Sequence, residues 1–568
     1  MFRRLLISIA AVIALVALSV PASSAGGPGP KQQLSQIDHI VVIYEENHSF
    51  DNLYGLWEGV RGLSDVDRAH TAQVGQYGTR YQCLLQDDLN LQSPPLSATC
   101  TDSTTPTTFT SHFPNEPFNI DAYIGPNDTT CPPSPSVAFT HPNGWLNGTG
   151  SPGGCTRDLV HRFYQEQYQL NGGRQNRYVT GSDAAGLSMG YYDTTQLPIY
   201  QYLHQSGHPD YAILDDFFQG AFGGSFLNHQ WLVAAAPPTY PGAAASLHSV
   251  LDANGMPVLR SPPASQSPVA LYTSPRASGL VDGPLTSSCP APLGLACGDY
   301  AVNTMQPFAQ PSGPFGAKLP AQTAPTIGDR LTGAGVDWAW YAGGWSNAAG
   351  DVSAPGWTNG AGPGPDCPDP NAFENPAWPY CPDFLFQFHH QPFTYYAAYG
   401  PDTPGRAHLR DEQEFIQAAQ ASTASCGLKP VSFVKPIGEE NEHPGYASEP
   451  DGSDHLVSLL QDIQNSACAD DTMVVVTYDE FGGQWDHVPP PGMGNNGPHD
   501  QWGPGTRIPA LVISPFLRAE FVVDGKEHDT TSILTTIEHR FGLAPLSSRD
   551  AAVRDLSSVF AAESPFED

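Results

Sequence analysis

The sequence predicts a mixed α/β sandwich that carries long, loop-rich insertions. Apolar runs rich in β-branched residues alternate along the chain with segments of helical period, which is the pattern of an α/β fold. Two of these runs end abruptly in acidic or amide residues, and open α/β sheets bind ligands beyond the carboxyl ends of their strands. Glycine and proline number 56 each, and charged residues make up only 14% of the 568 residues, so we expect long loops.

The first apolar run covers residues 40–44 and ends in Glu46 and Asn47. Its β-branched composition predicts a buried strand. A carboxylate beside an amide at a strand end offers two hard oxygen ligands, which is half of a metal site. A strand-to-helix turn with Asn47 or Ser49 as the helix N-cap explains the same residues.

The second run covers residues 473–478 and ends in Asp479 and Glu480, which two glycines follow closely. Adjacent carboxylates repel each other, and burial raises that cost, so a cation is the simplest way to hold them together. Two strands of one parallel sheet could thus assemble a single divalent site from Glu46, Asn47, Asp479 and Glu480. The alternative is a solvated turn.

The third segment places Ser225 directly after Gly223 and Gly224, ahead of a run with helical potential. Backbone N–H groups and the helix dipole favour a phosphate at such a helix start, and glycines let the backbone approach a ligand closely. Ser225 would also serve as an ordinary N-cap, which stabilises a helix by about 1 kcal/mol.

Together these segments resemble the bacterial phosphoesterase family of acid phosphatases and phospholipases C, over residues 37 to about 543. The matching segments are ENHSFD at 46–51, FGGS at 222–225, NEHP at 441–444, YDEFGG at 478–483, DHVPPP at 486–491, GPGTRIPALVISP at 503–515 and DTTSIL at 529–534. The resemblance implies a three-layer α/β/α sandwich with an alkaline-phosphatase-like core.

The resemblance also implies chemistry. It assigns one divalent metal ion to Glu46, Asn47, Asp479 and Glu480, and it makes Ser225 the nucleophile that is transiently phosphorylated. The acid-phosphatase branch has two aspartates where this chain has Asp479 and Glu480, and the longer Glu480 is the less certain direct ligand. Asn and carboxylate oxygens suit Ca²⁺, Mg²⁺, Mn²⁺ or Fe, so the identity of the metal stays open.

Three histidines, His161, His390 and His443, resemble residues that the acid-phosphatase branch places in its pocket. Imidazolium groups can neutralise phosphate oxygens or protonate a leaving alkoxide. Because His389 adjoins His390, that assignment could shift by one residue. Asp486 and His487 follow the second run and could orient a metal ligand from behind. A histidine of this kind is, taken alone, more often an ordinary core or surface residue.

We expect the remaining elements from hydrophobic period and from capping residues. Strands are expected at 211–214, 336–341, 431–434 and 508–514, and helices at 158–177, 197–204, 411–421, 453–468 (capped by Asp451 or Ser453) and 530–541 (ended by Gly542). Residues 26–568 would form a single catalytic domain, with insertions at about 62–154 and 237–382.

The N-terminus has the features of a secretory signal. Arg3 and Arg4 precede an apolar stretch at residues 5–20, and small residues follow up to Ala25. We expect a signal peptide at residues 1–25 and a secreted, periplasmic or cell-envelope protein. A retained membrane anchor is the alternative.

The ten cysteines of an exported chain predict disulfides. We expect sequence neighbours to pair, because they lie close together within loops. The expected pairs are Cys83 with Cys100, Cys131 with Cys155, Cys289 with Cys297, Cys367 with Cys381, and Cys426 with Cys468.

The net charge of −33 argues against nucleic acid or an anionic membrane as a partner. It also repels phosphate esters at long range, so the site needs local positive charge from a metal and histidines. The leading hypothesis is a metal-dependent acid phosphatase acting on a phosphate ester through a phosphoserine. The alternatives are a phospholipase C acting on phosphatidylcholine-like lipids and a non-catalytic secreted binding protein. The oligomeric state is left open.

Overall fold

The computed structural model describes most of the chain after residue 28. The described residues are 29–67, 71–85, 96–104, 108–123, 158–244, 247–249, 251–257, 271–272, 285–286, 299–302, 304–312, 316–358, 383, 386–445, 447, 449–492 and 497–566. The expected signal peptide lies outside these residues. Within them, no helix combines the length and the apolar character that crossing a membrane requires.

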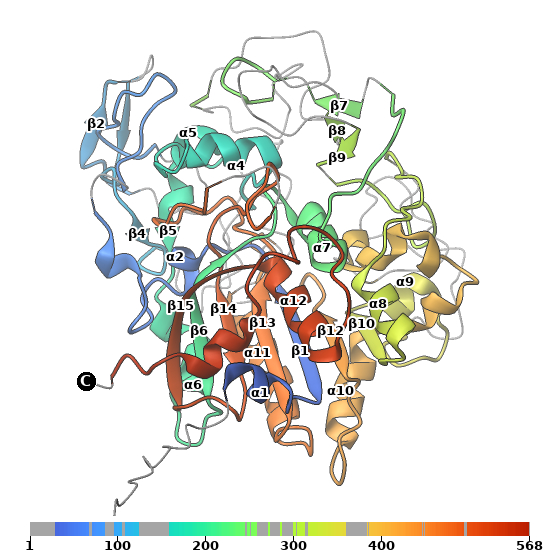
Figure 1. Ribbon diagram of the computed structural model, residues 1–568. Coiled ribbons are helices and arrows are strands. Elements are labelled where there is room, and N and C mark those ends of the chain that lie inside the picture. Colours follow the sequence, from blue (N-terminus) through green and yellow to red (C-terminus); the bar gives the residue numbers. More distant parts are fainter. Residues whose placement is uncertain are drawn as a thin grey trace, which may run out of the picture.

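A mixed eight-stranded sheet forms the centre of the molecule (Figure 1), in the order β11-β10-β12-β1-β13-β14-β6-β15. The strands are β1 (His39–Glu45), β6 (Tyr211–Phe218), β10 (Trp338–Ala342), β11 (Leu409–Asp411), β12 (Val431–Lys435), β13 (Thr472–Tyr478), β14 (Ala510–Ile513) and β15 (Phe521–Asp529). All pairs are parallel except those that β14 makes with β13 and β6. Seven strands therefore end at the same edge of the sheet.

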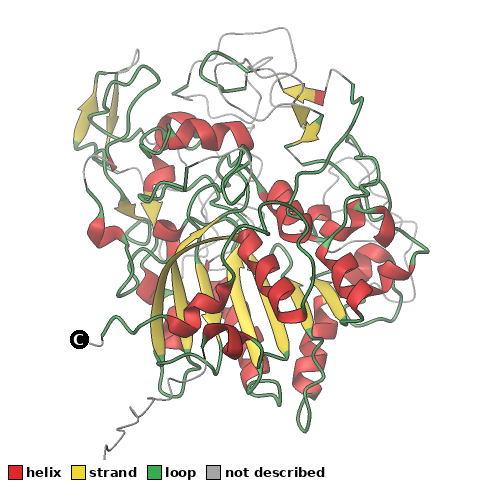
Figure 2. Ribbon diagram, in the orientation of Figure 1, coloured by secondary structure: helices red, strands yellow, loops and turns green. Residues whose placement is uncertain are grey.

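Helices cover both faces of the sheet (Figure 2), so the fold has three layers, as the sequence predicted. One group that packs together is α6 (Pro198–Leu203), α10 (Glu412–Ala421) and α11 (Glu449–Gln464). A second group is α1 (Pro30–Leu34), α7 (Ser225–Ala234), α12 (Thr530–Phe541) and the 3-10 helix η10 (Leu556–Ala561).

The central strands are buried on both faces, as near-continuous apolar runs predict for a parallel sheet. Every residue of β13 is buried, and so is every residue of β1 except His39. β1 lies between β12 and β13, and in its register with β13 Tyr44 pairs with Thr477 and Glu45 with Tyr478. This register places the acidic ends of the two strands side by side.

Most helix boundaries agree with their capping residues. Asp411 caps α10 through the Gln413 N–H, and Gly542 ends α12 in the left-handed conformation with φ 67°. The expected cap of α11 is wrong, because the helix begins at Glu449. The Ser453 hydroxyl instead accepts a hydrogen bond from Ile199 N of α6, at 2.9 Å.

Other differences from the expected elements arise where the local pattern is weak. The helix expected at 158–177 is shorter, α4 (Phe163–Leu170), and is followed by the left-handed residue Asn171. β6 runs on to Phe218 instead of ending at residue 214. Strands β11 and β15 are not evident from sequence, because β11 has three residues and β15 is a charged edge strand with a register shift after Asp524.

The two expected insertions contain small sheets away from the central one. The first contributes β2 (Cys100–Asp102), β3 (Phe109–Ser111) and β4 (Phe118–Asn119), which pairs with β5 (Gly190–Tyr191); the second contributes β7 (His248–Ser249), β8 (Leu285–Thr286) and β9 (Tyr300–Ala301). The range 237–382 is too wide as an insertion, since α8 (Ile327–Ala334) leads into β10 of the central sheet and α9 (Trp345–Ala349) follows it.

Two of the expected disulfides are present, Cys83–Cys100 and Cys426–Cys468. The six remaining cysteines lie outside the described residues.

Candidate active site

The ends of β1 and β13 bring four oxygen-bearing residues together beside the start of α7. We call Glu46, Asn47, Asp479 and Glu480 the metal cluster; all four are fully buried. Ser225, the first residue of α7, adjoins it. Its Oγ lies 3.1 Å from Glu46 Oε2, 3.3 Å from Asn47 Oδ1 and 3.3 Å from Glu480 Oε1. The residues expected from the three sequence segments therefore converge on one point.

The amide of Asn47 faces the carboxylates with one end and His443 with the other. The inner end lies 2.8 Å from Glu46 Oε2, 2.9 Å from Asp479 Oδ1 and 3.1 Å from Glu480 Oε1. If this end were the NH₂ group, it would donate to the carboxylates and no ion would be needed. The protonation of His443 decides between the two orientations.

His443 Nδ1 lies 2.7 Å from the carbonyl oxygen of Pro444, so Nδ1 carries the proton. In the neutral imidazole Nε2 is then an acceptor, and burial, which lowers the pKa of His443, favours this form. This Nε2 lies 2.7 Å from the outer end of Asn47, which must then be the NH₂ group. The amide oxygen of Asn47 therefore points inward.

The metal cluster is thus a set of carboxylate and amide oxygens that face one another. In addition, Asp479 Oδ2 is buried without a hydrogen-bond partner. Buried oxygens in this arrangement repel unless a cation lies among them. Hard oxygen donors are the ligands of Ca²⁺, Mg²⁺, Mn²⁺ and iron, so the residues present fit a divalent metal.

The electrostatics of the cluster agree with this assignment. Burial, followed by the charge of Glu46, raises the pKa of Asp479 to about 8. Burial and the charge of Asp479 raise the pKa of Glu480 well above its ordinary value, although His161 opposes the shift. The protein alone therefore leaves these two carboxylates poorly compensated.

Lys435, at the end of β12, is a site residue that the sequence did not reveal. Its buried Nζ lies 2.7 Å from Glu46 Oε1 and donates to the Tyr44 carbonyl at 2.8 Å. Burial alone would raise the pKa of Glu46, but Lys435 and His390 lower it well below its ordinary value. In the sequence, the feature that could have indicated it is a lysine at the end of a largely apolar strand.

The predicted histidines line a cavity of about 470 Å³ that opens beside Ser225. Its lining includes Ser225, His161, His389, His390 and His443. His161 Nε2 lies 3.4 Å from Glu480 Oε1, and His390 Nε2 lies 2.9 Å from Glu46 Oε1. Burial opposes a charge on His161, yet Glu480 and Asp158 raise its pKa to about 10. The structure thus gathers the histidines around Ser225.

His229 is a further, fully buried histidine at the site, and the sequence did not single it out. It follows Ser225 by one helical turn, and its ring stacks on His390 with centroids 5.3 Å apart. Its Nε2 lies 4.0 Å from Glu46 Oε1. The i, i+4 spacing from Ser225 was the signal that could have found it.

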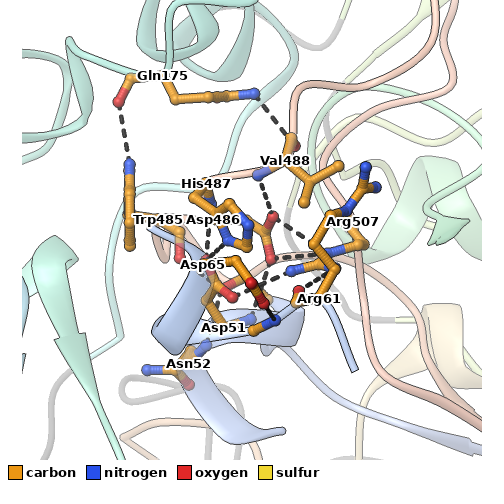
Figure 3. Close-up of polar contacts among 12 residues, drawn as sticks. Asp51, Asn52, Arg61, Asp65, Gln175, Trp485, Asp486, His487, Val488 and Arg507 are labelled. Carbon is orange, nitrogen blue, oxygen red and sulfur yellow. Dashed lines mark hydrogen bonds and ion pairs between the residues drawn. The ribbon is translucent and has the colours of Figure 1, made fainter. Parts of the chain in front are cut away.

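Asp486 and His487 belong to a different group, shown in Figure 3. We call Asp51, Asp486, His487 and Arg507 the arginine cluster. The buried guanidinium lies 3.0 Å from Asp51 and 3.2 Å from Asp486, and His487 Nδ1 lies 2.6 Å from Asp51. No hydrogen bond or ion pair of the described residues joins Asp486 or His487 to the metal cluster. A direct role for them in orienting a metal ligand has no support in these contacts.

A comparison with family models matches residues 37–544 to the phosphoesterase family. Among curated relatives, phospholipase C B of Mycobacterium tuberculosis strain H37Rv is 36% identical over 159 residues, which cover 23% of this chain and 29% of that protein. Non-specific phospholipase C6 of Arabidopsis thaliana is 28% identical over 144 residues, 22% of this chain and 28% of that protein. The matched part thus spans less than a third of either relative.

Among solved structures, a protein of the alkaline phosphatase superfamily from Vibrio parahaemolyticus is similar with 12% identity and a TM-score of 0.28, over 66% of this chain and 65% of that one.

Proposed function

Because the chain belongs to the phosphoesterase family, we propose that it is an exported, metal-dependent phosphoric-ester hydrolase that acts as an acid phosphatase through a phosphoserine at Ser225. One observation carries the proposal. Ser225 Oγ lies within 3.3 Å of three oxygens of the metal cluster, at the mouth of a histidine-lined cavity. A nucleophile, a cation site and proton donors in one cavity are the parts that phosphoryl transfer requires.

Ser225 is placed to attack phosphorus. A divalent cation held by the metal cluster would lower the pKa of the serine hydroxyl and stabilise charge on the phosphoryl oxygens. Ser225 is also the first residue of α7, where the leading N–H groups have no partner within the helix. These N–H groups and the helix dipole favour the phosphate of a substrate.

The reaction then has two steps. The hydroxyl proton of Ser225 leaves to solvent, Oγ forms a bond to phosphorus while the bond from phosphorus to the leaving alkoxide breaks, and a histidine supplies the proton that the alkoxide takes. Water next attacks the phosphoserine, the bond from phosphorus to Oγ breaks, one proton of the water passes to Oγ, and the histidine is reprotonated from solvent. Inorganic phosphate is the product.

The three histidines all contact the metal cluster but differ in burial, which supports different tasks for them. His390 and His443 are buried and contact Glu46 and Asn47 respectively, so they are suited to orient ligands. The His161 side chain is 18% exposed in the cavity. His161 is therefore the best-placed proton donor to the leaving group.

A phospholipase C activity is the second candidate, because the relatives named above carry that name. The same serine and cavity would then act on a phosphodiester. Its phosphorylated head group would be transferred to Ser225, and the diacylglycerol alkoxide would be the leaving group. The two candidates differ in whether the phosphorus of the substrate carries one ester bond or two.

A hydrolysis screen separates these candidates. Purified protein is assayed with p-nitrophenyl phosphate, p-nitrophenyl phosphorylcholine and bis(p-nitrophenyl) phosphate, with Ca²⁺, Mg²⁺, Mn²⁺ or Fe²⁺ restored after chelation. The phosphatase proposal expects the monoester to react fastest, and preference for the phosphorylcholine ester would favour phospholipase C. No turnover of any ester with any metal would support the non-catalytic alternative.

The covalent step has its own test. Ser225→Ala should lower kcat by about 10³-fold or more while substrate still binds, since the metal cluster and the histidines remain. Wild-type protein quenched in acid during turnover of a labelled monoester should carry the label on the peptide that contains Ser225. Label on another residue, or near-normal turnover of the alanine variant, contradicts the proposal.

A further inference from the structure

The loop that leads from β6 to Ser225 is held by a buried glutamine that also reaches the residue after Glu480. Gln219 directly follows β6, and its side chain is fully buried. Its Nε2 donates to the carbonyl oxygens of Ala221, at 2.7 Å, and Gly223, at 3.2 Å. Its Oε1 accepts from the backbone N–H of Phe481, at 3.0 Å. One side chain therefore joins the loop before Ser225 to the residue after Glu480.

The orientation of this amide is fixed by Glu166 of α4. Glu166 is fully buried and accepts from Gln219 Nε2 at 2.9 Å, from Gly223 N at 2.6 Å, and from the N–H and hydroxyl of Thr506 at 2.8 Å each. Every group that faces the carboxylate is a donor. The NH₂ end of Gln219 must therefore point to Glu166, which leaves its oxygen for Phe481.

The packing around the pair leaves little room for another arrangement. A Cβ on Gly505 would lie 2.6 Å from Gln219 Cγ and 2.6 Å from Glu166 Oε1. A Cβ on Gly223, which has φ +92°, would lie 2.6 Å from the backbone nitrogen of Phe163. The glycines let the backbone close around the two side chains, so the loop before Ser225 has one geometry.

We propose that Gln219, oriented by Glu166, is a positioning residue that sets the separation between Ser225 Oγ and the Asp479–Glu480 pair. Ser225 and the Asp479–Glu480 pair come from segments more than 250 residues apart, and the Gln219 side chain hydrogen-bonds to the backbone of both segments. Misplacing a reacting atom by about 1 Å can cost about 10²-fold in rate. The inference rests on the proposed function, because it takes Ser225 as the nucleophile and the metal cluster as an ion site.

Two substitutions at Gln219 test the link. Gln219→Met keeps the length but removes all hydrogen bonds, so both loops are released. Gln219→Glu keeps an acceptor for Phe481 N but sets a carboxylate against Glu166 and two carbonyl oxygens, so only the nucleophile loop is disturbed. Both variants should lower kcat by about 30- to 100-fold, with KM within about 3-fold of the wild-type value.

Gln322 offers a matched control in another part of the chain. It is also a buried glutamine, with Oε1 accepting from Thr239 N at 2.9 Å and Nε2 donating to Thr239 O at 3.0 Å and Pro320 O at 2.7 Å. Gln322→Met and Gln322→Glu should lower thermal stability as much as the Gln219 variants but leave kcat within about 2-fold.

Metal binding supplies a readout that does not depend on turnover. Mn²⁺ affinity, measured by electron paramagnetic resonance of free Mn²⁺, should fall about tenfold in Gln219→Met, which releases Phe481, and stay near wild type in Gln219→Glu. If the wild-type protein hydrolyses no ester, the proposed function fails, whereas this measurement still tests the link to the metal cluster.

Milder variants cover the case in which Gln219→Met and Gln219→Glu do not fold. Gln219→Asn keeps the amide but is one methylene too short to span both loops, and Glu166→Gln presents an NH₂ group to donors; each should show the same selective loss of kcat, about tenfold. The proposal is overturned if Gln219 variants keep kcat and Mn²⁺ affinity within twofold of wild type, or if Gln322 variants lose kcat equally.

Discussion

Two buried groups of acids lie at the same edge of the sheet, and the same two loops supply both. The segment after β1 gives Glu46 and Asn47 to the metal cluster and Asp51, in the short helix α2 (Phe50–Leu53), to the arginine cluster. The loop after β13 gives Asp479 and Glu480 to the metal cluster and Asp486 to the arginine cluster. In the arginine cluster, Arg507 lies within 3.2 Å of both carboxylates (Figure 3). Among the described residues, the only side chain with a permanent positive charge within 4 Å of the metal cluster is Lys435, and of the four cluster residues it reaches Glu46 alone.

The difference teaches how to separate structural acids from functional ones. In a buried carboxylate pair that contacts a guanidinium, the negative charges are compensated within the chain. Such a group serves to hold segments together. A buried group of carboxylates without such a partner needs charge from outside the chain. Four predictions follow from this contrast, ordered from the largest expected effect to the smallest.

The largest effect should come from neutralising one acid in each cluster. Asp479→Asn should lose the bound metal and lower kcat/KM by about 10³-fold, because the cluster loses a negative charge and one carboxylate oxygen is replaced by an NH₂ group that cannot bind a cation. Asp486→Asn, the matched change in the arginine cluster, should keep the metal at wild-type stoichiometry. Elemental analysis and initial rates of both variants decide the point. Full metal occupancy with normal turnover in Asp479→Asn would remove the assignment.

Removing the guanidinium of Arg507 should lower the stability of the fold instead of the activity. Arg507→Met leaves Asp51 and Asp486 buried and unpaired, and we expect it to lower the free energy of unfolding by about 3–5 kcal/mol. Arg410, which forms a partly exposed ion pair with Glu414, is the control, since Arg410→Met should cost less than about 1 kcal/mol. Denaturant unfolding of metal-loaded protein measures both. Equal losses in the free energy of unfolding for the two variants would mean that the arginine cluster stabilises the fold no more than the partly exposed ion pair does.

The supplied cation should stabilise the fold only through the metal cluster. Adding metal to chelated protein at 100 times its Kd should raise the free energy of unfolding by about 2.7 kcal/mol. Asp479→Asn should show no such increase, whereas Arg410→Met should keep it. Unfolding curves with and without metal provide the measurement. An equal gain in Asp479→Asn would place the ion elsewhere in the protein.

The smallest effect concerns the pH dependence of the arginine cluster. Burial opposes a charge on His487, but its hydrogen bond to Asp51 and the charge of that carboxylate raise the pKa of His487 above its ordinary value. A raised pKa in the folded state adds stability that is fully present below the pKa of the unfolded chain and is lost as the pH rises through the folded-state pKa.

His487→Asn should therefore cost more stability at pH 5.5 than at a pH above the folded-state pKa. Unfolding curves of the variant and the wild type across this range are the check. A difference that grows toward high pH would contradict the sign.

Local patterns were sufficient for the strands and helices that frame the site. β1, β12 and β13 are apolar runs, and Asp529 and Gly542 mark the ends of α12, so each is readable within about ten residues. β15 was missed because it is an edge strand in which charged residues occupy both buried and exposed positions, so it has no apolar run. The cap of α11 was wrong because a distant backbone group uses Ser453.

The candidate site divides in the same way. The oxygen ligands and Ser225 stand at element boundaries, where the sequence changes character abruptly. Lys435, His229, Glu166 and Gln219 have no such local mark, because their importance comes from contacts with residues far along the chain. Asp486 and His487 show the opposite case. Their position after β13 suggested a place beside the metal cluster, but they belong to the arginine cluster with Arg507.

The sequence by itself determined the apolar strands β1, β12 and β13 and which oxygens and hydroxyl stand at the element boundaries of the site. Propensity, hydrophobic period and turn residues act over a few residues, so they are legible in a single chain. The tertiary structure alone decided that β1 pairs in parallel with β13, that the Ser225 loop is joined to the Glu480 loop, and which acids receive a guanidinium. Those choices depend on pairing and burial between segments hundreds of residues apart, where many small free energies sum and no local pattern records the result.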